Sequence, residues 1–251
     1  MEVKFAPPPP NYLCKCCLNQ ALLFDVCDFN KSPIKVNLCG IPIYYYRCES
    51  CGFIFTCAFD SWGREEFSHF IYNQDYIHFD PDYREVRPQS NADLLQNHLK
   101  MDKHFDILDY GCGNGRMLEI LRQNGYKIDG YDAFSDTFKA KPTKQYDMIV
   151  AFEVVEHICD VLGTFQEIFG MLKEGGVFLF STLLQPQNIL DMGTHWWYIA
   201  PRNGHISIFT QQSLENLCQR IHSEYAIFSL SQGLHLMFNP KHLPRYFLGI
   251  Q

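Results

Sequence analysis

Apolar and polar positions between residues 105 and 238 repeat with two different periods. Short apolar runs are typical of strands, whereas apolar positions three or four residues apart predict helices. We expect strands at residues 105–110, 126–131, 146–152, 177–183, 226–230 and 234–238, and helices at 91–104, 116–124, 161–172 and 213–221. Because these strands alternate with helices, the pattern favours a doubly wound α/β sheet.

A glycine-rich turn follows the first expected strand, in the run Asp109-Tyr-Gly-Cys-Gly-Asn-Gly115. Glycine allows a sharp turn and close approach of a ligand to the backbone, and the N-terminus of the next helix presents N–H groups to a polar or anionic group. Asp132 lies 21 residues beyond Gly111, at the end of the next strand. A carboxylate there can accept hydrogen bonds from both hydroxyls of a ribose. The alternative is a tight turn beside a solvated aspartate.

The glycine spacing is G-x-G-x-G, whereas a dinucleotide fingerprint has G-x-G-x-x-G. With the acidic Asp109 before it, this run resembles the first motif of the class I S-adenosylmethionine-dependent methyltransferases. Residues 146–158 are similar to the segment after the fourth strand in ubiquinone-pathway O-methyltransferases, and residues 172–182 are similar to the family's entry into its fifth strand. The resemblance implies a Rossmann-like sheet of the seven-stranded type, S-adenosylmethionine as cofactor, and methyl transfer as the activity.

The resemblance also implies which residues contact the cofactor. Gly111, Cys112 and Gly113 would line its methionine part beside Asp109, and Asp132 would hold the ribose. The remaining expected contacts are Tyr76 in an aromatic lid, Ala133 and Phe134 near the adenine, and Phe152 and Glu153 on the cofactor's other side. Only fourteen residues separate Asp132 from Asp147, where family members fit a further helix and strand. We therefore expect a sheet shortened around its third strand.

Eight of the eleven cysteines lie between residues 11 and 58. Cys14 and Cys17 form one Cys-x-x-Cys pair, Cys48 and Cys51 form another, and four thiolates in two such pairs suit a closed, structural zinc site. Cys16 could replace Cys14 or Cys17, and buried thiols without a metal are the alternative. The chain is thus expected to comprise a Pro-rich lead-in (1–10), a zinc-ribbon-like region (11–58), an aromatic linker or lid (59–86) and the S-adenosylmethionine-binding domain (87–251). It also resembles the methyltransferase subgroup with an N-terminal zinc-binding region.

Two histidines are candidates for the general base that a hydroxyl, an acidic carbon or a protonated amine requires. His157 follows Glu156, in a pair that related O-methyltransferases and sugar C-methyltransferases have at the active site. His205 follows an aromatic run, where the family usually carries substrate loops. Sugar C-methyltransferases have a glutamate before the corresponding histidine, whereas this chain has Gly204, which argues against C-methylation of a sugar.

The formal net charge is −7 and no run of Lys or Arg occurs, so a nucleic-acid substrate is not favoured. The sequence has neither a signal-peptide pattern nor an apolar run of membrane-spanning length, which favours a cytoplasmic protein with reduced cysteines. We expect a small-molecule substrate, such as a nucleotide-linked sugar, a glycan residue or a hydroxylated metabolite. The alternatives are a methyltransferase acting on tRNA or protein, and a zinc-ribbon scaffold protein whose cofactor domain is inactive. The oligomeric state stays open.

Overall fold

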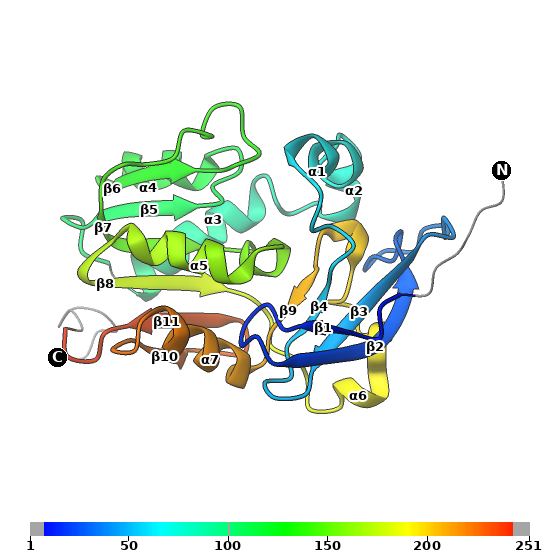
Figure 1. Cartoon of the computed structure of the whole chain (residues 1–251). Helices are drawn as coiled ribbons and strands as arrows, with labels where there is room; N and C mark the ends of the chain where they lie inside the picture. Colours follow the sequence, from blue (N-terminus) through cyan, green and yellow to red (C-terminus); the bar gives the residue numbers. More distant parts are fainter. Residues whose placement is uncertain (1–7, 100, 243–251) are drawn as a thin grey trace.

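The computed structural model describes residues 8–99 and 101–242. Its larger sheet has six strands in the order β10-β11-β8-β7-β5-β6. The four parallel strands are β5 (Asp106–Tyr110), β6 (Lys127–Tyr131), β7 (Tyr146–Ala151) and β8 (Leu172–Ser181), and the antiparallel hairpin of β10 (Ala226–Ser229) and β11 (Leu234–Phe238) extends the sheet beyond β8. The doubly wound, Rossmann-like α/β sheet expected from the sequence is therefore confirmed (Figure 1).

Helices cover both faces of this sheet because both faces are apolar. The strand residues Ile107, Met148 and Leu179 share a buried cluster with α3 (Val86–Asp93) and α4 (Arg116–Gln123). The alternate residues Leu108, Ile149 and Phe178 belong to a second cluster, with α5 (Val161–Gly170) and α7 (Gln211–Ile221). Successive side chains of a strand point to opposite faces, so a continuous apolar run is what a sheet covered on both sides requires.

The connection between β6 and β7 is short, as expected. Residues 132–145 form neither a helix nor a strand, so β6 is the edge of the sheet. The helix expected at residues 91–104 is wrong in its bounds. α3 begins at Val86, and a single π-helical segment, η1 (Leu94–His98), ends the helical part. Met101 is buried although it lies beyond the helix, so its apolar character reflects core packing rather than helical periodicity.

A second sheet of five strands, in the order β1-β2-β3-β4-β9, contains most of the cysteine-rich region. Its strands are β1 (Asn11–Leu13), β2 (Gln20–Asp28), β3 (Pro42–Cys48), β4 (Ile54–Thr56) and β9 (Ser207–Ile208). β9 comes from the long connection between β8 and α7 and pairs antiparallel with β4. This connection also contains α6 (Ile189–Met192), η3 (Gly193–His195) and η4 (Pro201–Asn203). The cysteine-rich region therefore shares a sheet with a distant part of the chain.

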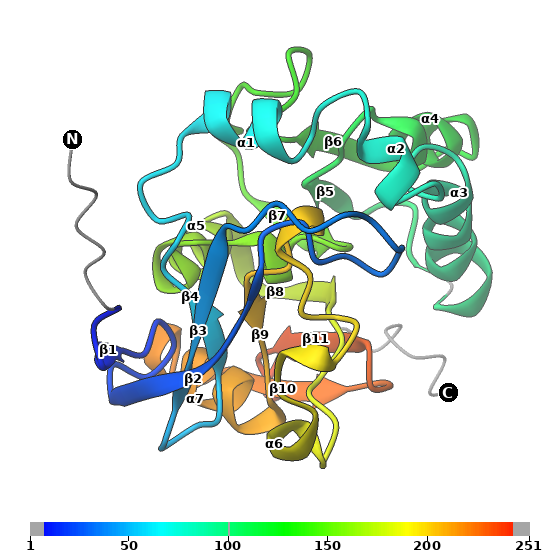
Figure 2. The same ribbon diagram turned by 90° about the vertical axis from the view of Figure 1, so that its right-hand side faces the viewer.

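Two short helices follow the cysteine-rich region, α1 (Arg64–Phe70) and α2 (Tyr76–Phe79). They lie beyond the carboxyl ends of β5 and β6, toward which the strand arrows point (Figures 1 and 2). Arg64 of α1 donates a hydrogen bond to the Phe134 carbonyl and pairs with Asp136 at 2.7 Å, which ties α1 to the loop after β6. In open α/β sheets, ligands bind beyond the carboxyl ends of the strands, where these two helices lie.

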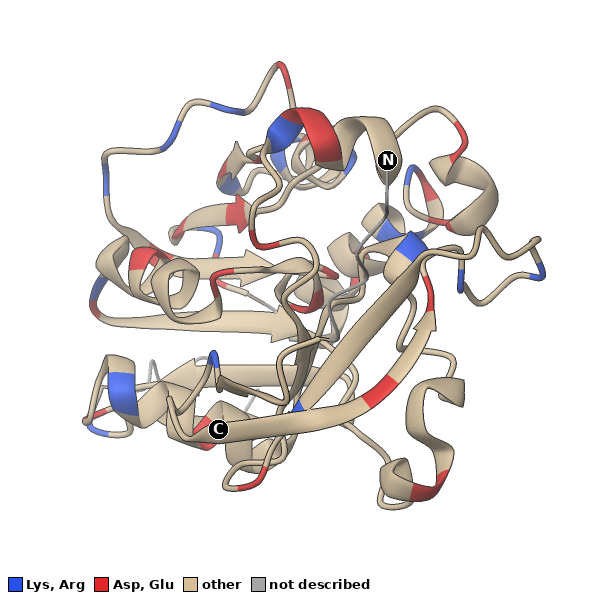
Figure 3. Ribbon diagram, turned by 45° about the vertical axis from the view of Figure 1, so that its right-hand side comes forward, with Lys and Arg blue, Asp and Glu red and all other residues tan. Residues whose placement is uncertain are grey.

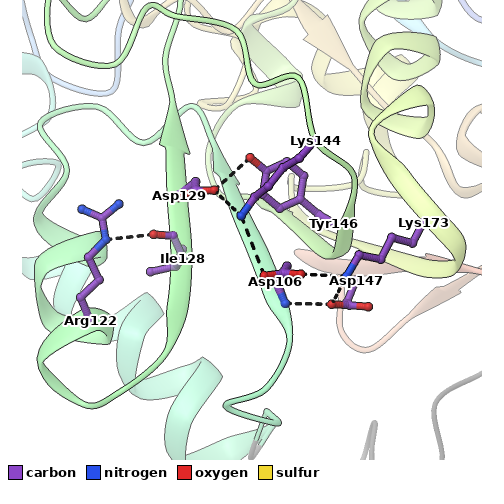
Figure 4. A network of polar contacts seen from close by, with 8 residues as sticks. All are labelled: Asp106, Arg122, Ile128, Asp129, Lys144, Tyr146, Asp147 and Lys173. Atoms are coloured by element: carbon purple, nitrogen blue, oxygen red, sulfur yellow. Dashed lines mark hydrogen bonds and ion pairs between the residues drawn. The ribbon is translucent and has the colours of Figure 1, made fainter.

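A network of ion pairs lies at the other end of the sheet, near the amino ends of the strands (Figure 4). Lys173 lies 2.8 Å from both Asp106 and Asp147, and Lys144 lies 2.8 Å from Asp129. These residues stand at or near the starts of neighbouring strands and hold the parallel strands in register. Elsewhere, most Lys and Arg positions lie near Asp or Glu positions, except along the loop between β6 and β7, where Lys139, Lys141 and Lys144 follow one another with no acidic residue between them (Figure 3). None of the described helices is long and apolar enough to cross a membrane.

Candidate cofactor and acceptor site

A cavity of about 510 Å³ opens between the carboxyl ends of β5, β6 and β7 and the helices α1 to α3. All twelve residues expected from the sequence to bind the cofactor or act in catalysis line it. They are Tyr76, Asp109, Gly111, Cys112, Gly113, Asp132, Ala133, Phe134, Phe152, Glu153, His157 and His205. The volume lies in the range usual for small-ligand sites. The residues expected to act together are thus brought together, and their individual roles stay predictions.

Backbone amides orient the Asp132 carboxylate. One oxygen accepts hydrogen bonds from the N–H groups of Phe134 (2.7 Å) and Ser135 (3.0 Å), and the other accepts one from the N–H of Gly113 (2.9 Å). The carboxylate therefore joins the glycine turn to the loop after β6. Lone pairs not used by these amides can accept ligand hydroxyls, since an ionised carboxylate has about four acceptor positions.

Gly111 is required by both its backbone and its surroundings. Its φ is +86°, a left-handed conformation that side chains disfavour, and a Cβ atom there would lie 2.3 Å from Cγ2 of Val154. Val154 belongs to the segment after β7, so the turn and this segment pack in direct contact. Glu153 beside it also has a positive φ, +55°. Its N–H donates to the Ser181 hydroxyl (2.7 Å), and that hydroxyl donates to its carboxylate (2.9 Å), which holds the strained residue in place.

Asp109 is a buried carboxyl group at the floor of the cavity. Only 4% of its surface is exposed, and no hydrogen bond to its side chain occurs among the described residues. Burial raises the pKa of Asp109 to about 8, and the neighbouring Asp132 carboxylate adds to the effect. A cation bound in the cavity would favour the ionised form of Asp109.

His157 and His205 form another part of the cavity wall, with ring centroids 4.9 Å apart. His205 Nδ1 lies 2.9 Å from the Tyr198 carbonyl oxygen, so the bond requires a proton on Nδ1 and leaves the lone pair on Nε2. Burial lowers the pKa of His205 to about 4 and lowers the pKa of His157 well below its usual value, in the latter case with help from His205. Both imidazoles are therefore neutral at pH 7.

The imidazole of His157 lies where a side chain at residue 204 would begin, which only glycine allows. Its φ is +83°, and a Cβ atom at this position would lie 2.7 Å from His157 Nδ1 and 3.3 Å from the Tyr72 hydroxyl. A glutamate here, as in sugar C-methyltransferases, would need this wall to be rebuilt. The position of His157 therefore requires glycine at residue 204.

The four cysteines of the two Cys-x-x-Cys pairs converge on one point. Sγ atoms lie 3.6 Å apart for Cys14–Cys51, 3.4 Å for Cys17–Cys48 and 3.6 Å for Cys17–Cys51. Four sulfurs at about 2.3 Å from a tetrahedral zinc would be about 3.8 Å apart, so the set fits this metal. Cys16 is not one of the four converging sulfurs, although it is buried beside Cys14, whose Sγ accepts a hydrogen bond from the Cys16 N–H at 3.4 Å.

The family model for a methyltransferase domain matches residues 83–222, more than half of the chain. The chain belongs to the methyltransferase domain family. The matched segment contains β5 to β9, the glycine turn, Asp132 and both cavity histidines, and it begins just before Arg87. The cysteine-rich region and the helices α1 and α2 lie outside it.

Curated relatives of this methyltransferase domain are distant. The chain is 23% identical over 130 residues to the ubiquinone biosynthesis O-methyltransferase of Rickettsia felis, covering 43% of this chain and 53% of the relative. It is 22% identical over 160 residues to the malonyl-[acyl-carrier protein] O-methyltransferase of Enterobacter lignolyticus, covering 56% and 63%. The chain thus spans about half the length of the first relatives it matches. The solved magnesium protoporphyrin IX methyltransferase of Synechocystis PCC 6803 with bound SAH has a TM-score of 0.48, is 12% identical and covers 70% of this chain and 97% of its own.

Several cavity residues of the methyltransferase were not expected from the sequence. They are Trp62, Phe67, Asp80, Tyr83 and Cys159. Arg87, which precedes the glycine turn by more than twenty residues, also lines the cavity and pairs with Asp80 at 2.5 Å. The dense aromatic positions between Phe59 and Tyr83 were the available indication, but their spacing matches no motif, so only the tertiary structure shows which of them face the cavity.

Proposed function

We propose that this chain transfers a methyl group from S-adenosylmethionine to a small-molecule acceptor. S-adenosylmethionine, when bound, supplies the methyl group on a sulfonium centre. The observation that carries the proposal is that the twelve expected site residues line a single cavity at the ligand-binding edge of the sheet. Membership of the methyltransferase domain family supports it independently.

Different residues along the cavity contact different parts of the cofactor. Asp132 accepts the ribose hydroxyls, and the turn at Gly111 to Gly113 lets the methionine part approach the backbone. The aromatic side chains of Tyr72 and Tyr76 pack edge to face, with centroids 5.3 Å apart, and both line the cavity. Methyl transfer from a sulfonium needs in-line alignment of the acceptor and exclusion of water. Packed against the bound cofactor, Tyr72 and Tyr76 exclude water and limit the positions that the acceptor can take.

The acceptor lies at the wall formed by His157 and His205, where an imidazole takes up its proton. His205 is the better placed of the two for direct proton transfer, because its Nδ1–H bond to the Tyr198 carbonyl fixes the lone pair on Nε2. The O-methyltransferase names of the curated relatives favour an oxygen acceptor, such as a hydroxylated metabolite or a sugar. The formal net charge of −7 does not favour RNA as the acceptor.

We also propose that Cys14, Cys17, Cys48 and Cys51 hold a structural zinc ion. The four sulfurs fit a tetrahedral ion, and four protein ligands leave no open position for chemistry. The region of residues 11–58 is then a zinc ribbon whose stability depends partly on metal.

Calorimetry with S-adenosylmethionine tests the cofactor assignment. Asp132→Ala should weaken binding by about 1.5–3 kcal/mol, roughly tenfold to a hundredfold, because a charge-assisted hydrogen bond is lost. Asp191→Ala, which removes an exposed carboxylate of α6, is the matched control and should bind as the wild type does. Absence of binding to the wild type, or equal binding by Asp132→Ala, would refute the assignment. Labelled cofactor offered with sugar nucleotides, hydroxylated metabolites or RNA then identifies the acceptor class.

A further inference from the structure

Three side chains place possible metal-ligand atoms close together: His157 and His205, which form the acceptor wall of the cavity, and Glu156, which is buried behind it. One carboxylate oxygen of Glu156 and one ring nitrogen each from His157 and His205 lie within 4.8 Å of one another. Glu156 and His157 belong to η2 (Val155–His157), whereas His205 comes from the connection after β8. The backbone holds the two segments together, because the N–H of Ile206 donates to the Glu156 carbonyl at 2.9 Å.

Some polar atoms of these three side chains are buried without a hydrogen-bond partner among the described residues. Glu156 is fully buried, and its Oε1 accepts a hydrogen bond from the Tyr198 hydroxyl at 2.8 Å. Its Oε2 and the Nδ1 of His157 are buried and have no hydrogen-bond partner among the described residues. A buried carboxylate is costly unless it is paired or coordinates a metal. The unused atoms belong to two of the three converging side chains.

Outer contacts already orient two of the three side chains. The Tyr198 hydroxyl holds Glu156, and the carbonyl of the same residue accepts the Nδ1–H bond of His205, which directs the Nε2 lone pair away from the backbone. Such contacts, a carbonyl behind a histidine and a donor behind a carboxylate, are what surrounds the ligands of a metal site. A single residue, Tyr198, supplies both.

We propose that Glu156, His157 and His205 bind a divalent first-row metal ion that contacts the acceptor. Two imidazoles and one carboxylate are a common ligand set for such ions and leave positions open. Ligands at about 2.0–2.2 Å from a shared ion lie about 3–4.4 Å apart, so the present spacing needs little contraction. His157 and His205 line the cavity, which puts the open positions on the side of the acceptor.

This inference rests on the proposed methyl transfer and changes the role of the two histidines. A divalent ion lowers the pKa of a hydroxyl group that it contacts, so the acceptor proton leaves to solvent instead of to an imidazole. The acceptor oxygen then attacks the methyl carbon. The carbon–sulfur bond breaks with its electron pair remaining on sulfur, which yields S-adenosylhomocysteine and the methylated acceptor. The proposal therefore points to an oxygen acceptor.

Binding of Mn²⁺ by the full chain tests the site, followed through the electron paramagnetic resonance signal of the unbound ion. Mn²⁺ is the suitable probe because thiolates prefer softer ions, so the cysteine cluster can keep its own metal. We expect one Mn²⁺ per wild-type chain and at least tenfold weaker binding by Glu156→Gln and His205→Ala. His195→Ala removes an exposed histidine of η3 and should bind Mn²⁺ like the wild type.

Calorimetry with S-adenosylmethionine shows separately whether each variant is folded and binds cofactor. Retained cofactor binding together with lost Mn²⁺ binding supports the metal site. Failure of the wild type to bind Mn²⁺, or unchanged Mn²⁺ binding by both variants, would overturn the metal site and leave the proposed methyl transfer intact. Failure of the wild type to bind the cofactor would instead refute the methyl transfer on which the acceptor role of the ion depends.

Discussion

Asp109 should make the binding of S-adenosylmethionine stronger as the pH rises toward about 8. Burial raises the pKa of this carboxyl to about 8, so at pH 7 it is mostly protonated when no cation lies beside it. S-adenosylmethionine carries a sulfonium and an ammonium group, and a cation favours the ionised carboxylate. Binding should therefore release a proton from Asp109, and affinity should rise with pH up to about 8.

The size of the effect follows from the pKa of about 8. If only the ionised carboxylate admits the cation, the dissociation constant exceeds its limiting value at high pH by a factor of about 100 at pH 6, about 11 at pH 7 and about 1.1 at pH 9. Partial tolerance of the protonated form would reduce these factors, since each unit by which the cation lowers the pKa is worth about tenfold in affinity.

The assay is calorimetric titration between pH 6 and pH 9 with wild type, Asp109→Asn and the control Asp191→Asn. Asp109→Asn places a neutral group at the same position, so the rise in affinity with pH should disappear, whereas Asp191→Asn should keep it. The amine of the ligand loses its own proton near pH 8, which weakens binding at the alkaline end in every variant. S-adenosylhomocysteine has this amine but no sulfonium, so comparing both ligands separates the two cations. A wild-type affinity constant across pH 6–8 would refute the reasoning.

Two further outcomes test the glycine turn and the cysteine cluster. Gly111→Ala should lower both thermal stability and cofactor affinity, because its Cβ atom would meet Val154 at 2.3 Å and the left-handed conformation costs about 1–2 kcal/mol. Gly125 has a similar φ, +84°, but a Cβ atom there would have no neighbour within 4 Å. Gly125→Ala should therefore lower the melting temperature by the backbone cost alone and leave cofactor affinity unchanged. Equal effects of the two variants would contradict the packing argument. Elemental analysis should find one zinc ion per wild-type chain and much less in Cys48→Ser, which removes one of the four thiols. Cys39→Ser, outside the cluster, is the control and should keep the zinc. Undiminished zinc in Cys48→Ser would count against the zinc ribbon.

The proximity of the residues expected to bind the cofactor could be predicted from the sequence, because the position of each depends on local structure. Gly111 and Asp132 each follow directly from a strand end, and parallel neighbours in a sheet bring such ends together. The short connection after Asp132 was likewise evident from its length, and the structure confirms that residues 132–145 contain no further strand. Local patterns fail where the helix bounds depend on packing, as at α3, which starts at Val86 and ends in a π-helical segment.

The acceptor half could be predicted only in part because its contacts join distant segments. His157 and His205 are identifiable as chemical groups, but their contact depends on 47 intervening residues and on the space left by Gly204. The bond from Tyr198 to Glu156 and the pairing of β4 with β9 have no local sequence pattern. The same holds for Arg87 and Asp80, whose position in the cavity depends on how α2 and α3 pack.

The cysteine-rich sheet supports the wall formed by His157 and His205 directly, so a zinc ion bound by the four cysteines would also stabilise that wall. The Tyr45 hydroxyl of β3 donates to the His205 carbonyl at 2.9 Å. The Thr210 hydroxyl donates to the Cys51 carbonyl at 2.6 Å, and Gln185 donates to the Gly52 carbonyl at 2.9 Å. The last two bonds attach both ends of the segment carrying His205 to Cys51 and the adjacent Gly52. Among the described residues, no hydrogen bond joins the glycine turn or Asp132 to the cysteine pairs. Loss of zinc should therefore disturb the acceptor wall before it disturbs cofactor binding.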